Sequence, residues 1–482
     1  MVLTVTTAAT KARELVPVVR ERLADLETPV SAFAKLRPLG GAFLLESVEG
    51  GERMGRYSFI GVLPRATLVF RDGVASILED GGVRAVPYTD PLALLRSETA
   101  RYHRSGAKEL PRFSGGAVGY VSYEAARRFE RLPVAPRDVL RLPEAAFSIY
   151  DTVVCFDHVR HSLLVIAHEL EGEREGAASR IARVFAALDA PISLPTQTEH
   201  ALRTVTANGT ADEYRARVAK ARQLIQEGDC IQIVVAQRFD VRPSPEPLAL
   251  YRALRHVNPS PYMFLIDVAG AALVGASPEP FVRVEDGRVV MYPIAGTRPR
   301  GRDETEDAAM EAELRASEKE RAEHVMLVDL ARNDIGRVSR AGTVRVRELM
   351  RVDRFSHVMH LTSVVDGELA AGLDALDAFR ACFPAGTVSG APKIRAMERI
   401  AELETDRRGP YAGAVGYLGF DGRMDTCIGI RTAVIADGVC RIEAGAGIVA
   451  DSDPAAEELE TRAKARALLR AVELVDGAEA LR

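Results

Sequence analysis

The chain has 482 residues, of which 47% are hydrophobic and 27% charged, and its formal net charge is -5 at pH 7. These values are typical of a folded globular protein with room for more than one domain. The Lys and Arg residues are spread along the sequence, which argues against a nucleic-acid-binding surface, and the longest apolar run (residues 264–276) is too short for a membrane helix.

At the N-terminus no basic stretch precedes an apolar block, so we do not expect a secretion signal. Residues 11–26 instead predict a polar amphipathic helix, and we expect a cytoplasmic protein.

The five cysteines are odd in number and widely spaced, so we expect buried thiols rather than disulfides or a zinc site. None lies in a Gly-x-Cys-x-Gly turn, so the chain is not expected to hydrolyse glutamine itself. They are Cys155, Cys230, Cys382, Cys427 and Cys440.

Regular elements are predicted along the whole chain. Asp-Gly pairs between β-branched residues predict hairpins, because Asp and Gly tolerate the positive φ of tight turns. They are Asp72-Gly73, Asp286-Gly287, Asp421-Gly422 and Asp437-Gly438. Apolar periodicity predicts helices over residues 211–227, 305–331, 391–403 and 454–475. The fold class is therefore α+β with large antiparallel β-sheets.

Residues 189–210, rich in Pro, Thr, Ser and Asn, predict a boundary between an N-terminal domain (1–195) and a C-terminal domain (205–482).

Two of these helices carry pairs of carboxylates. Glu320 and Glu323 are three residues apart and share one helical face. Glu457 and Glu460 form a second such pair in a helix that Asp453 can cap. Together the two faces could hold a hard divalent cation such as Mg²⁺, which prefers oxygen ligands. The spacing alone favours an ordinary solvated acidic face.

Other polar residues stand in apolar or glycine-rich surroundings. Gly445 and Gly447 allow the backbone to approach an anion, although tight turns use the same pattern. Arg431 lies in an apolar strand and needs a carboxylate partner from the protein or from a substrate. His357 and His360 lack a third ligand at zinc-like spacing, so His360 is more readily a proton-transfer, hydrogen-bonding or structural residue.

Longer motifs in a fixed order resemble those of the chorismate-utilising enzymes, and most closely the large subunits of anthranilate synthases. The resemblance covers residues 211 to the C-terminus and is weaker before that, where Phe43-Leu-Leu-Glu-Ser matches best. The main motifs are Asn258-Pro-Ser-Pro-Tyr-Met-Phe, Gly275-Ala-Ser-Pro-Glu-Pro, Pro293-Ile-Ala-Gly-Thr-Arg-Pro-Arg-Gly, Glu323-His-Val-Met-Leu-Val-Asp-Leu-Ala-Arg-Asn-Asp, Phe383-Pro-Ala-Gly-Thr-Val-Ser-Gly-Ala-Pro-Lys and Arg408-Gly-Pro-Tyr-Ala-Gly-Ala-Val-Gly-Tyr.

The resemblance implies a sandwich core of antiparallel sheets with helices packed outside, and a site for chorismate. Glu323 and Glu460 are implied to bind Mg²⁺ directly, with Glu320 and Glu457 acting through water, and the metal to hold the ring carboxylate. Glu279 is implied to be the general acid, which needs a raised pKa, and His360 to lie beside the ring. The substrate-binding residues implied are Gly296, Thr297, Thr387, Tyr411, Arg431, Gly445, Ala446, Gly447 and, more weakly, Lys464.

The implied reaction is the conversion of chorismate and ammonia into anthranilate and pyruvate, the first committed step of tryptophan biosynthesis. A separate glutamine amidotransferase subunit would supply the ammonia. Gln232 stands where water-adding relatives carry a base lysine, and Ala295 stands where aminodeoxychorismate synthases carry a nucleophilic lysine. Ser47, Pro261, Tyr262 and Met263 match the family's tryptophan site, which implies feedback inhibition.

Two other functions remain open on the sequence. An aminodeoxychorismate synthase would retain the enolpyruvyl side chain in its product. A tryptophan-sensing protein without catalysis would not need the helix carboxylates, Glu279, His360 and Arg431, all of which are present here.

Overall fold

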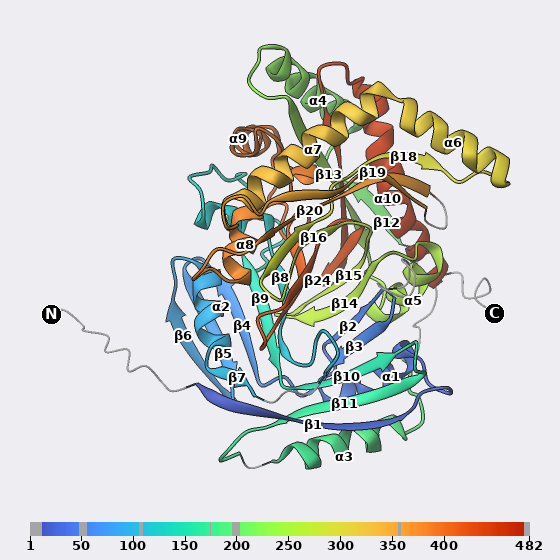
Figure 1. The fold of residues 1–482 in the computed structure, drawn as a ribbon. Coiled ribbons are helices and arrows are strands. Elements are labelled where there is room, and N and C mark those ends of the chain that lie inside the picture. The colour runs from blue at the N-terminus through green and yellow to red at the C-terminus, as the bar shows by residue number, and fades with distance from the viewer. Residues whose placement is uncertain are drawn as a thin grey trace.

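The computed structural model describes residues 12–47, 55–105, 109–173, 175–194, 203–354 and 358–476. Within these residues the strands form two large sheets (Figure 1). Neighbouring strands pair antiparallel, except that β1 (Arg13–Leu23) pairs parallel with β7 (Tyr102–Arg104).

The first sheet is built from both ends of the chain. Its strands are β1, β2 (Phe43–Glu46), β3 (Tyr57–Gly61), β7, β10 (Thr152–Asp157), β11 (Ser162–Glu169), β12 (Thr204–Ala207), β13 (Gln232–Arg242), β14 (Tyr262–Val268), β15 (Ala271–Ser277), β21 (Gly390–Ala391), β24 (Thr432–Ala436) and β25 (Val439–Ile448). They run in the order β12-β13-β25-β24-β15-β14-β2-β3-β10-β11-β1-β7, and β21 pairs with β13.

The second sheet has the same mixed origin. Its strands are β4 (Ala66–Arg71), β5 (Val74–Glu79), β6 (Gly82–Pro87), β8 (Gly116–Val121), β9 (Ala145–Tyr150), β16 (Pro280–Glu285), β17 (Arg288–Met291), β18 (Ile294–Pro299), β19 (Arg345–Arg354), β20 (Val358–Glu368), β22 (Ala414–Gly419) and β23 (Met424–Ile428). They run in the order β18-β20-β17-β16-β23-β22-β8-β9-β4-β5-β6, and β19 pairs with β20.

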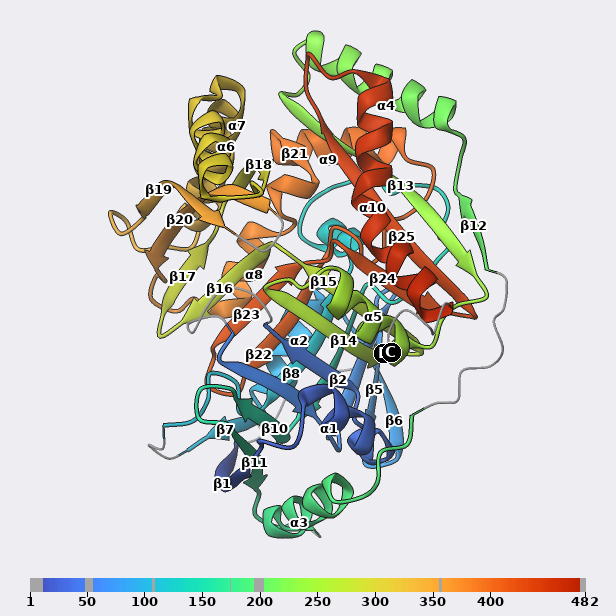
Figure 2. The same cartoon turned by 90° about the vertical axis from the view of Figure 1, so that its right-hand side faces the viewer.

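Helices cover the outer faces of the sheets. The α-helices are α1 (Pro29–Leu36), α2 (Pro91–Thr99), α3 (Ala177–Leu188), α4 (Ala211–Gln226), α5 (Pro247–Val257), α6 (Glu304–Ala316), α7 (Glu318–Gly336), α8 (Ala375–Cys382), α9 (Lys393–Leu403) and α10 (Pro454–Asp476). Three short 3₁₀ helices are η1 (Arg37–Leu39), η2 (Tyr123–Arg128) and η3 (Gly386–Val388). Figure 2 shows α10 running along the β13–β25 end of the first sheet.

An aromatic core joins the two sheets face to face. The ring of Phe59 in the first sheet lies 6.4 Å from that of Tyr417 in the second, edge to face. Phe43 approaches Tyr150, the last residue of β9 in the second sheet, to 4.8 Å in the same geometry. A separate apolar cluster packs α1, α3, α5 and α10 onto the outer face of the first sheet. The α+β class, with antiparallel sheets in a sandwich and helices outside, is confirmed.

Both sheets continue through the two halves of the chain. β2 pairs with β14, and β8 pairs with β22, so strands from before residue 195 and after residue 205 share each sheet. The division into domains 1–195 and 205–482 therefore stays a prediction about the sequence, and residues 195–202 at that boundary lie outside the described residues.

All four Asp-Gly predictions fall at turns between paired strands. Asp72, Asp286 and Asp437 have φ near 50°, and each is followed by a glycine of positive φ. In the fourth, Gly422 alone takes the positive φ. The predicted helices at 211–227, 391–403 and 454–475 correspond to α4, α9 and α10.

Two predicted helices are corrected. The helix expected over 305–331 is two helices, because Ser317 leaves helical geometry (ψ 110°) and its side chain caps α7 by accepting from the Glu320 amide. The helix expected over 11–26 is the strand β1 over the residues that the structure describes. Pro17 disfavours a helix interior, and the neighbouring residues pair along β11 from Val16 to Leu23.

All five cysteines are buried and free, as expected. Among the described helices, none combines the length and apolar character that crossing a membrane requires.

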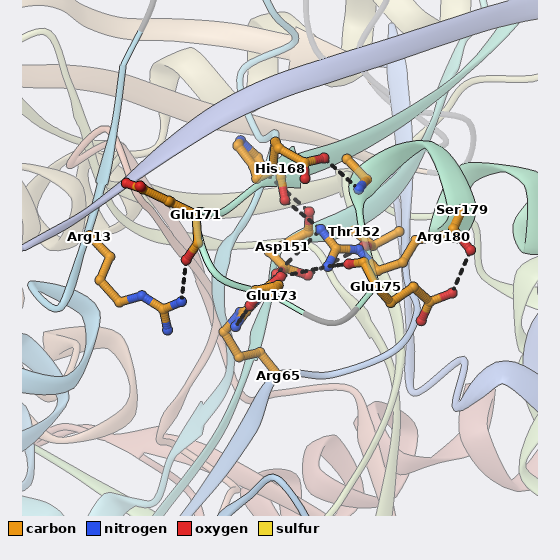
Figure 3. A network of polar contacts seen from close by, with 12 residues as sticks. Arg13, Arg65, Asp151, Thr152, His168, Glu171, Glu173, Glu175, Ser179 and Arg180 are labelled. Atoms are coloured by element: carbon orange, nitrogen blue, oxygen red, sulfur yellow. Dashed lines mark hydrogen bonds and ion pairs between the residues drawn. The ribbon is translucent and has the colours of Figure 1, made fainter.

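A network of buried charges holds the N-terminal part of the first sheet to α3 (Figure 3). Asp151, only 2% exposed, accepts a hydrogen bond from Arg65 Nε at 2.7 Å and lies 3.9 Å from Arg180. Glu173 pairs with the same two arginines, at 3.0 Å from Arg180. His168 Nδ1 lies 3.0 Å from the Asp151 carbonyl oxygen. Two carboxylates thus balance two guanidinium groups away from water.

We expect Asp151→Ala to destabilise the fold, because Arg65 and Arg180 would keep only one buried counter-charge. Removing one partner of a buried pair costs about 3–5 kcal/mol, which should appear as a large fall in the apparent melting temperature. The control is Asp189→Ala, whose own side chain is exposed and whose partner Arg22 is half-buried; ion pairs at the surface contribute about 1 kcal/mol or less. Equal effects of the two substitutions would contradict the assignment.

Candidate active site

A cavity of about 560 Å³, the main cavity, lies where the β13–β25 pair of the first sheet meets β18 and β20 of the second. Helix α7 packs on β18 and β20, and α10 packs on β25, so each helix borders one side of the cavity (Figure 2). Most residues singled out in the sequence line it: Glu279, Gly296, Thr297, Glu320, Glu323, His360, Thr387, Tyr411, Arg431, Gly445, Gly447, Glu457, Glu460 and Lys464.

The four helix carboxylates face this cavity from opposite sides. Glu320 and Glu323 lie on α7, and Glu457 and Glu460 lie on α10, which Asp453 begins by accepting from the Ala456 amide at 2.8 Å. The pKa of Glu323 is raised by burial and by Glu320 and Glu460 nearby, and that of Glu457 is raised by burial and by Glu460. These negative charges lie close together and are only partly balanced by positive charges of the protein. The site therefore favours binding of a cation.

Two of the carboxylates already have positively charged neighbours. Arg298 Nη1 lies 3.2 Å from Glu320, and Lys464 Nζ lies 2.6 Å from Glu460. Accordingly, within the described ranges no three His, Cys, Asp or Glu side chains form a ready-made metal cage. This arrangement fits a Mg²⁺ ion held by one or two carboxylates together with waters and substrate oxygens, as is usual for that ion. It does not fit a site built wholly from protein ligands.

Glu279 is a half-buried acid facing the main cavity. It follows β15, and its side chain accepts a hydrogen bond from Thr387 Oγ1 at 2.7 Å. Burial raises its pKa to about 7, although the Thr387 hydrogen bond and Lys464 oppose the rise. A carboxyl group with this pKa holds a proton for part of the time at neutral pH, which is the property of a general acid.

Arg431 brings a half-buried positive charge to the cavity. Its backbone has φ 50°, and Nη1 donates to the carbonyl oxygen of Lys464 at 2.7 Å. Burial lowers its pKa, and across the described residues it forms no ion pair. A half-buried guanidinium without a protein carboxylate suits an anionic substrate group.

Glycines keep the floor of the cavity open. A Cβ atom on Gly445 would lie 2.7 Å from the Tyr411 hydroxyl, and one on Gly447 would lie 2.7 Å from Gln232 Nε2. Strand alternation turns the intervening Ala446 to the opposite, fully buried side, so only its backbone is available to a ligand.

His360 extends from β20 beside β18. Its Nδ1 lies 3.0 Å from Thr297 Oγ1 and 3.2 Å from the Gly296 carbonyl oxygen. Burial lowers the pKa of His360, which keeps the ring neutral near pH 7. A Cβ atom at Gly296, where φ is 67°, would come within 2.9 Å of Leu314. His357 lies outside the described residues.

The sequence reading missed two charged residues that line the cavity. Lys319 lies one helical turn before Glu323, and that spacing could have revealed it. Glu443 lies two residues before Gly445 on the same face of β25, and burial raises its pKa well above the usual value. In that stretch of the sequence, only the Gly-x-Gly pattern was interpreted as part of a candidate site. Gln232 and Ala295, noted as discriminating positions, both line the cavity.

A second cavity, the β14 cavity, contains the other predicted ligand residues. Its volume is about 70 Å³, and Ser47, Pro261, Tyr262 and Met263 all line it. The remaining lining mixes apolar side chains with charged ones, namely Leu45, Glu46, Tyr57, Phe59, Arg112, Phe264, Arg283, Val415, Gly416, Tyr417, Asp425 and Cys427. Tyr262 donates to Asp425 at 2.8 Å. Sequence motifs far apart thus converge on two separate sites.

Comparisons with known proteins agree with this architecture. The family described as chorismate binding enzyme matches residues 41–470. Anthranilate synthase component 1 of Streptomyces coelicolor is 49% identical, over 98% of this chain and 92% of its own length. The protein of that name from Acetivibrio thermocellus is 44% identical, over 95% of each chain.

A solved structure shows the same fold. Anthranilate synthase component I of Streptococcus pneumoniae superposes with a TM-score of 0.78 at 39% identity, covering 86% of this chain and 92% of that one. With a family match over most of its length and relatives of this identity, the chain belongs to the chorismate binding enzymes and, among them, to the anthranilate synthase component 1 proteins.

Proposed function

We propose that this chain converts chorismate and ammonia into anthranilate and pyruvate in a Mg²⁺-dependent reaction. The observation that carries the proposal is Glu279, a half-buried acid with a pKa of about 7, in the same cavity as Arg431 and the carboxylates of α7 and α10. An acid, a site for an anionic group and a site for a hard cation are what this substrate requires. The cytoplasmic location expected from the sequence is part of the proposal.

The residues present suit a dianionic substrate. Arg431, the Tyr411 hydroxyl and the amides of Gly445–447 would hold the enolpyruvyl carboxylate. Glu323 and Glu460, supported by Glu320 and Glu457, would hold Mg²⁺. When bound, this ion would neutralise and orient the ring carboxylate.

Glu279 would donate its proton to the ring hydroxyl as that group leaves as water and ammonia forms the new carbon–nitrogen bond. The neutral His360 would lie beside the ring, where a cationic imidazole would compete with Mg²⁺ and Arg431 for the substrate's charges. Loss of the side chain as pyruvate, together with a ring proton, then makes the ring aromatic.

Two lining residues support amination over related reactions. The Gln232 amide cannot deprotonate water, and Ala295 cannot attack the substrate. Ammonia needs neither a base nor a covalent intermediate to act as a nucleophile. A glutamine amidotransferase partner would supply it, and free ammonium at high concentration would replace that partner.

Tryptophan is the proposed ligand of the β14 cavity. Apolar residues there suit an indole, while Arg112, Arg283, Glu46 and Asp425 offer both signs of charge to an amino-acid zwitterion. The cavity is also linked to the acid through the sheets. Tyr262 pairs with Ser277, two residues before Glu279, and Cys427 pairs with Pro280, the residue after it. Tryptophan would inhibit by favouring a conformation that binds chorismate less tightly.

The first prediction concerns Mg²⁺. With chorismate and an ammonium salt, the purified chain should form fluorescent anthranilate, and chelation should abolish the signal until Mg²⁺ is restored. Glu320→Gln and Glu457→Gln should raise the Mg²⁺ concentration for half-maximal rate by about 10–100-fold, as expected for supporting ligands, and Glu323→Gln by more. Glu318→Gln, an exposed change on the same helix, is the control. Full activity of chelated enzyme would contradict the proposal.

The second prediction concerns the proton of Glu279. The active form is protonated, so the rate of chorismate turnover should be constant at acidic pH and should fall as pH rises through about 7. The concentration of unprotonated ammonia must be kept constant across the profile, because its own titration would otherwise mask the fall. The Glu279→Gln variant should be slower by about 10²–10⁴-fold. Its rate should no longer fall as the pH rises through about 7. A profile identical in the variant would show that another group is the acid.

The third prediction concerns tryptophan. The chain contains no Trp residue, so the emission of bound tryptophan reports its own environment and should shift to the blue as the indole enters the β14 cavity. Saturating tryptophan should weaken chorismate binding by a factor within the usual allosteric range of about 5–150. Ser47→Leu should abolish the shift, and the exposed control Ser97→Leu should not. Unchanged chorismate affinity and turnover at saturating tryptophan would refute feedback.

A further inference from the structure

A third cavity, the η2 cavity, lies behind the main cavity. It has a volume of about 30 Å³ and is lined by η2, by the loop that follows it and by α9 and its C-terminal extension. A space of this size holds a water-sized molecule, and such a molecule remains there only if polar groups bind it. Neither the implied substrate site nor the implied tryptophan site uses this cavity.

One ion pair separates the η2 cavity from the main cavity. Arg408, 2% exposed, and Glu404 line the η2 cavity and bond to each other at 2.6 and 2.8 Å. The same guanidinium donates to the carbonyl oxygens of Val388 at 2.7 Å and Val234 at 2.8 Å, and both of these residues line the main cavity. Arg408 thus lies between the η2 cavity and two residues that line the main cavity.

Tyr123 provides a polar group with no protein partner. Its side chain lines the η2 cavity, its ring lies 4.7 Å from the Arg408 guanidinium carbon, and its hydroxyl is buried. That hydroxyl forms no hydrogen bond with any part of the chain that the structure describes. Glu124 beside it is already engaged, accepting from the amides of Arg408 at 2.7 Å and Gly409 at 3.0 Å. A buried hydroxyl of this kind calls for a small molecule that can donate to it or accept from it.

The outer side of the η2 cavity is close to the surface. Residues 132–135 form this side, and Pro133 among them is exposed. The cavity thus lies between solvent and the main cavity, on a path distinct from the side bordered by α10, where half of the Glu460 side chain is exposed.

We propose that the η2 cavity binds unprotonated ammonia on a second path into the main cavity; this inference rests on the proposed amination. The Tyr123 hydroxyl would bind the molecule. Entry would favour neutral ammonia over ammonium, because moving an ion out of water into so small a buried space costs far more free energy than moving a neutral polar molecule. Glu443, on the main-cavity side, would receive the ammonia that passes the Arg408–Glu404 pair. Ammonium added in bulk would use the α10 side instead.

The test compares two nitrogen sources in the complex with a glutamine amidotransferase partner. Ala401→Leu fills the η2 cavity from α9, and Tyr123→Phe removes only the hydroxyl. With glutamine, the anthranilate formed per glutamate released should fall by about tenfold in Ala401→Leu and by about fivefold in Tyr123→Phe, the latter as for one lost hydrogen bond. With saturating ammonium, both variants should match the wild type. Ala178→Leu adds the same volume on the exposed face of α3 and is the control.

A selective loss of glutamine-dependent coupling in either variant supports the inference. Unchanged coupling in both, or an equal fall with ammonium, overturns it and leaves the proposed function intact. Failure of the wild type to make anthranilate from chorismate and ammonium would refute the proposed function itself.

Discussion

The pairing of β13 with β25 positions one wall of the main cavity. Opposite residues of an antiparallel pair share a face, so Val234 and Gly447, then Ala236 and Gly445, then Arg238 and Glu443 form successive rows on the cavity side. A shift by one residue would turn every one of these side chains to the other face of the sheet. The glycines keep the space empty, and α10 follows β25 directly, so the same register fixes Glu457 and Glu460.

Charge distribution in the cavity explains its chemistry better than any single residue does. On one side, burial and the repulsion among neighbouring carboxylates raise the pKa of Glu323 and Glu457. On the other, Arg431 is half-buried and forms no ion pair with any carboxylate of the described residues. In the proposed function, a substrate with two carboxylates would resolve both problems at once, since one would meet Arg431 and the other would share a cation with the helices. Neither side alone would hold the dianion in one orientation.

Sequence patterns predicted correctly the elements that depend only on interactions between residues close in the chain. Asp-Gly pairs became turns because the turn needs only its own two residues, and i,i+3 spacing put Glu320 and Glu323 on one face. The strand β1 depends on a distant partner, β11, which the sequence alone did not indicate. The break at Ser317 rests on a local cap to the Glu320 amide, which the apolar periodicity does not reveal. No local pattern in the sequence predicts that α7 and α10 border the same cavity. The resemblance to the family's motifs indicated it. Partnerships such as Thr387 with Glu279, 108 positions apart, could not be read from either source.

The main cavity and the β14 cavity are lined by different residues, but paired strands connect them. Glu279 stands in a short segment between β15 and β16, and both flanking strands pair with residues of the β14 cavity. The pairing of β16 with β23 is interrupted between Pro280 and Arg283, so this stretch can change its position without breaking a continuous ladder. A ligand that moves Tyr262 or Cys427 by a fraction of an ångström would therefore move the acid relative to Thr387. Because the pKa of Glu279 depends on that contact and on burial, the regulatory ligand would alter proton donation as well as substrate affinity.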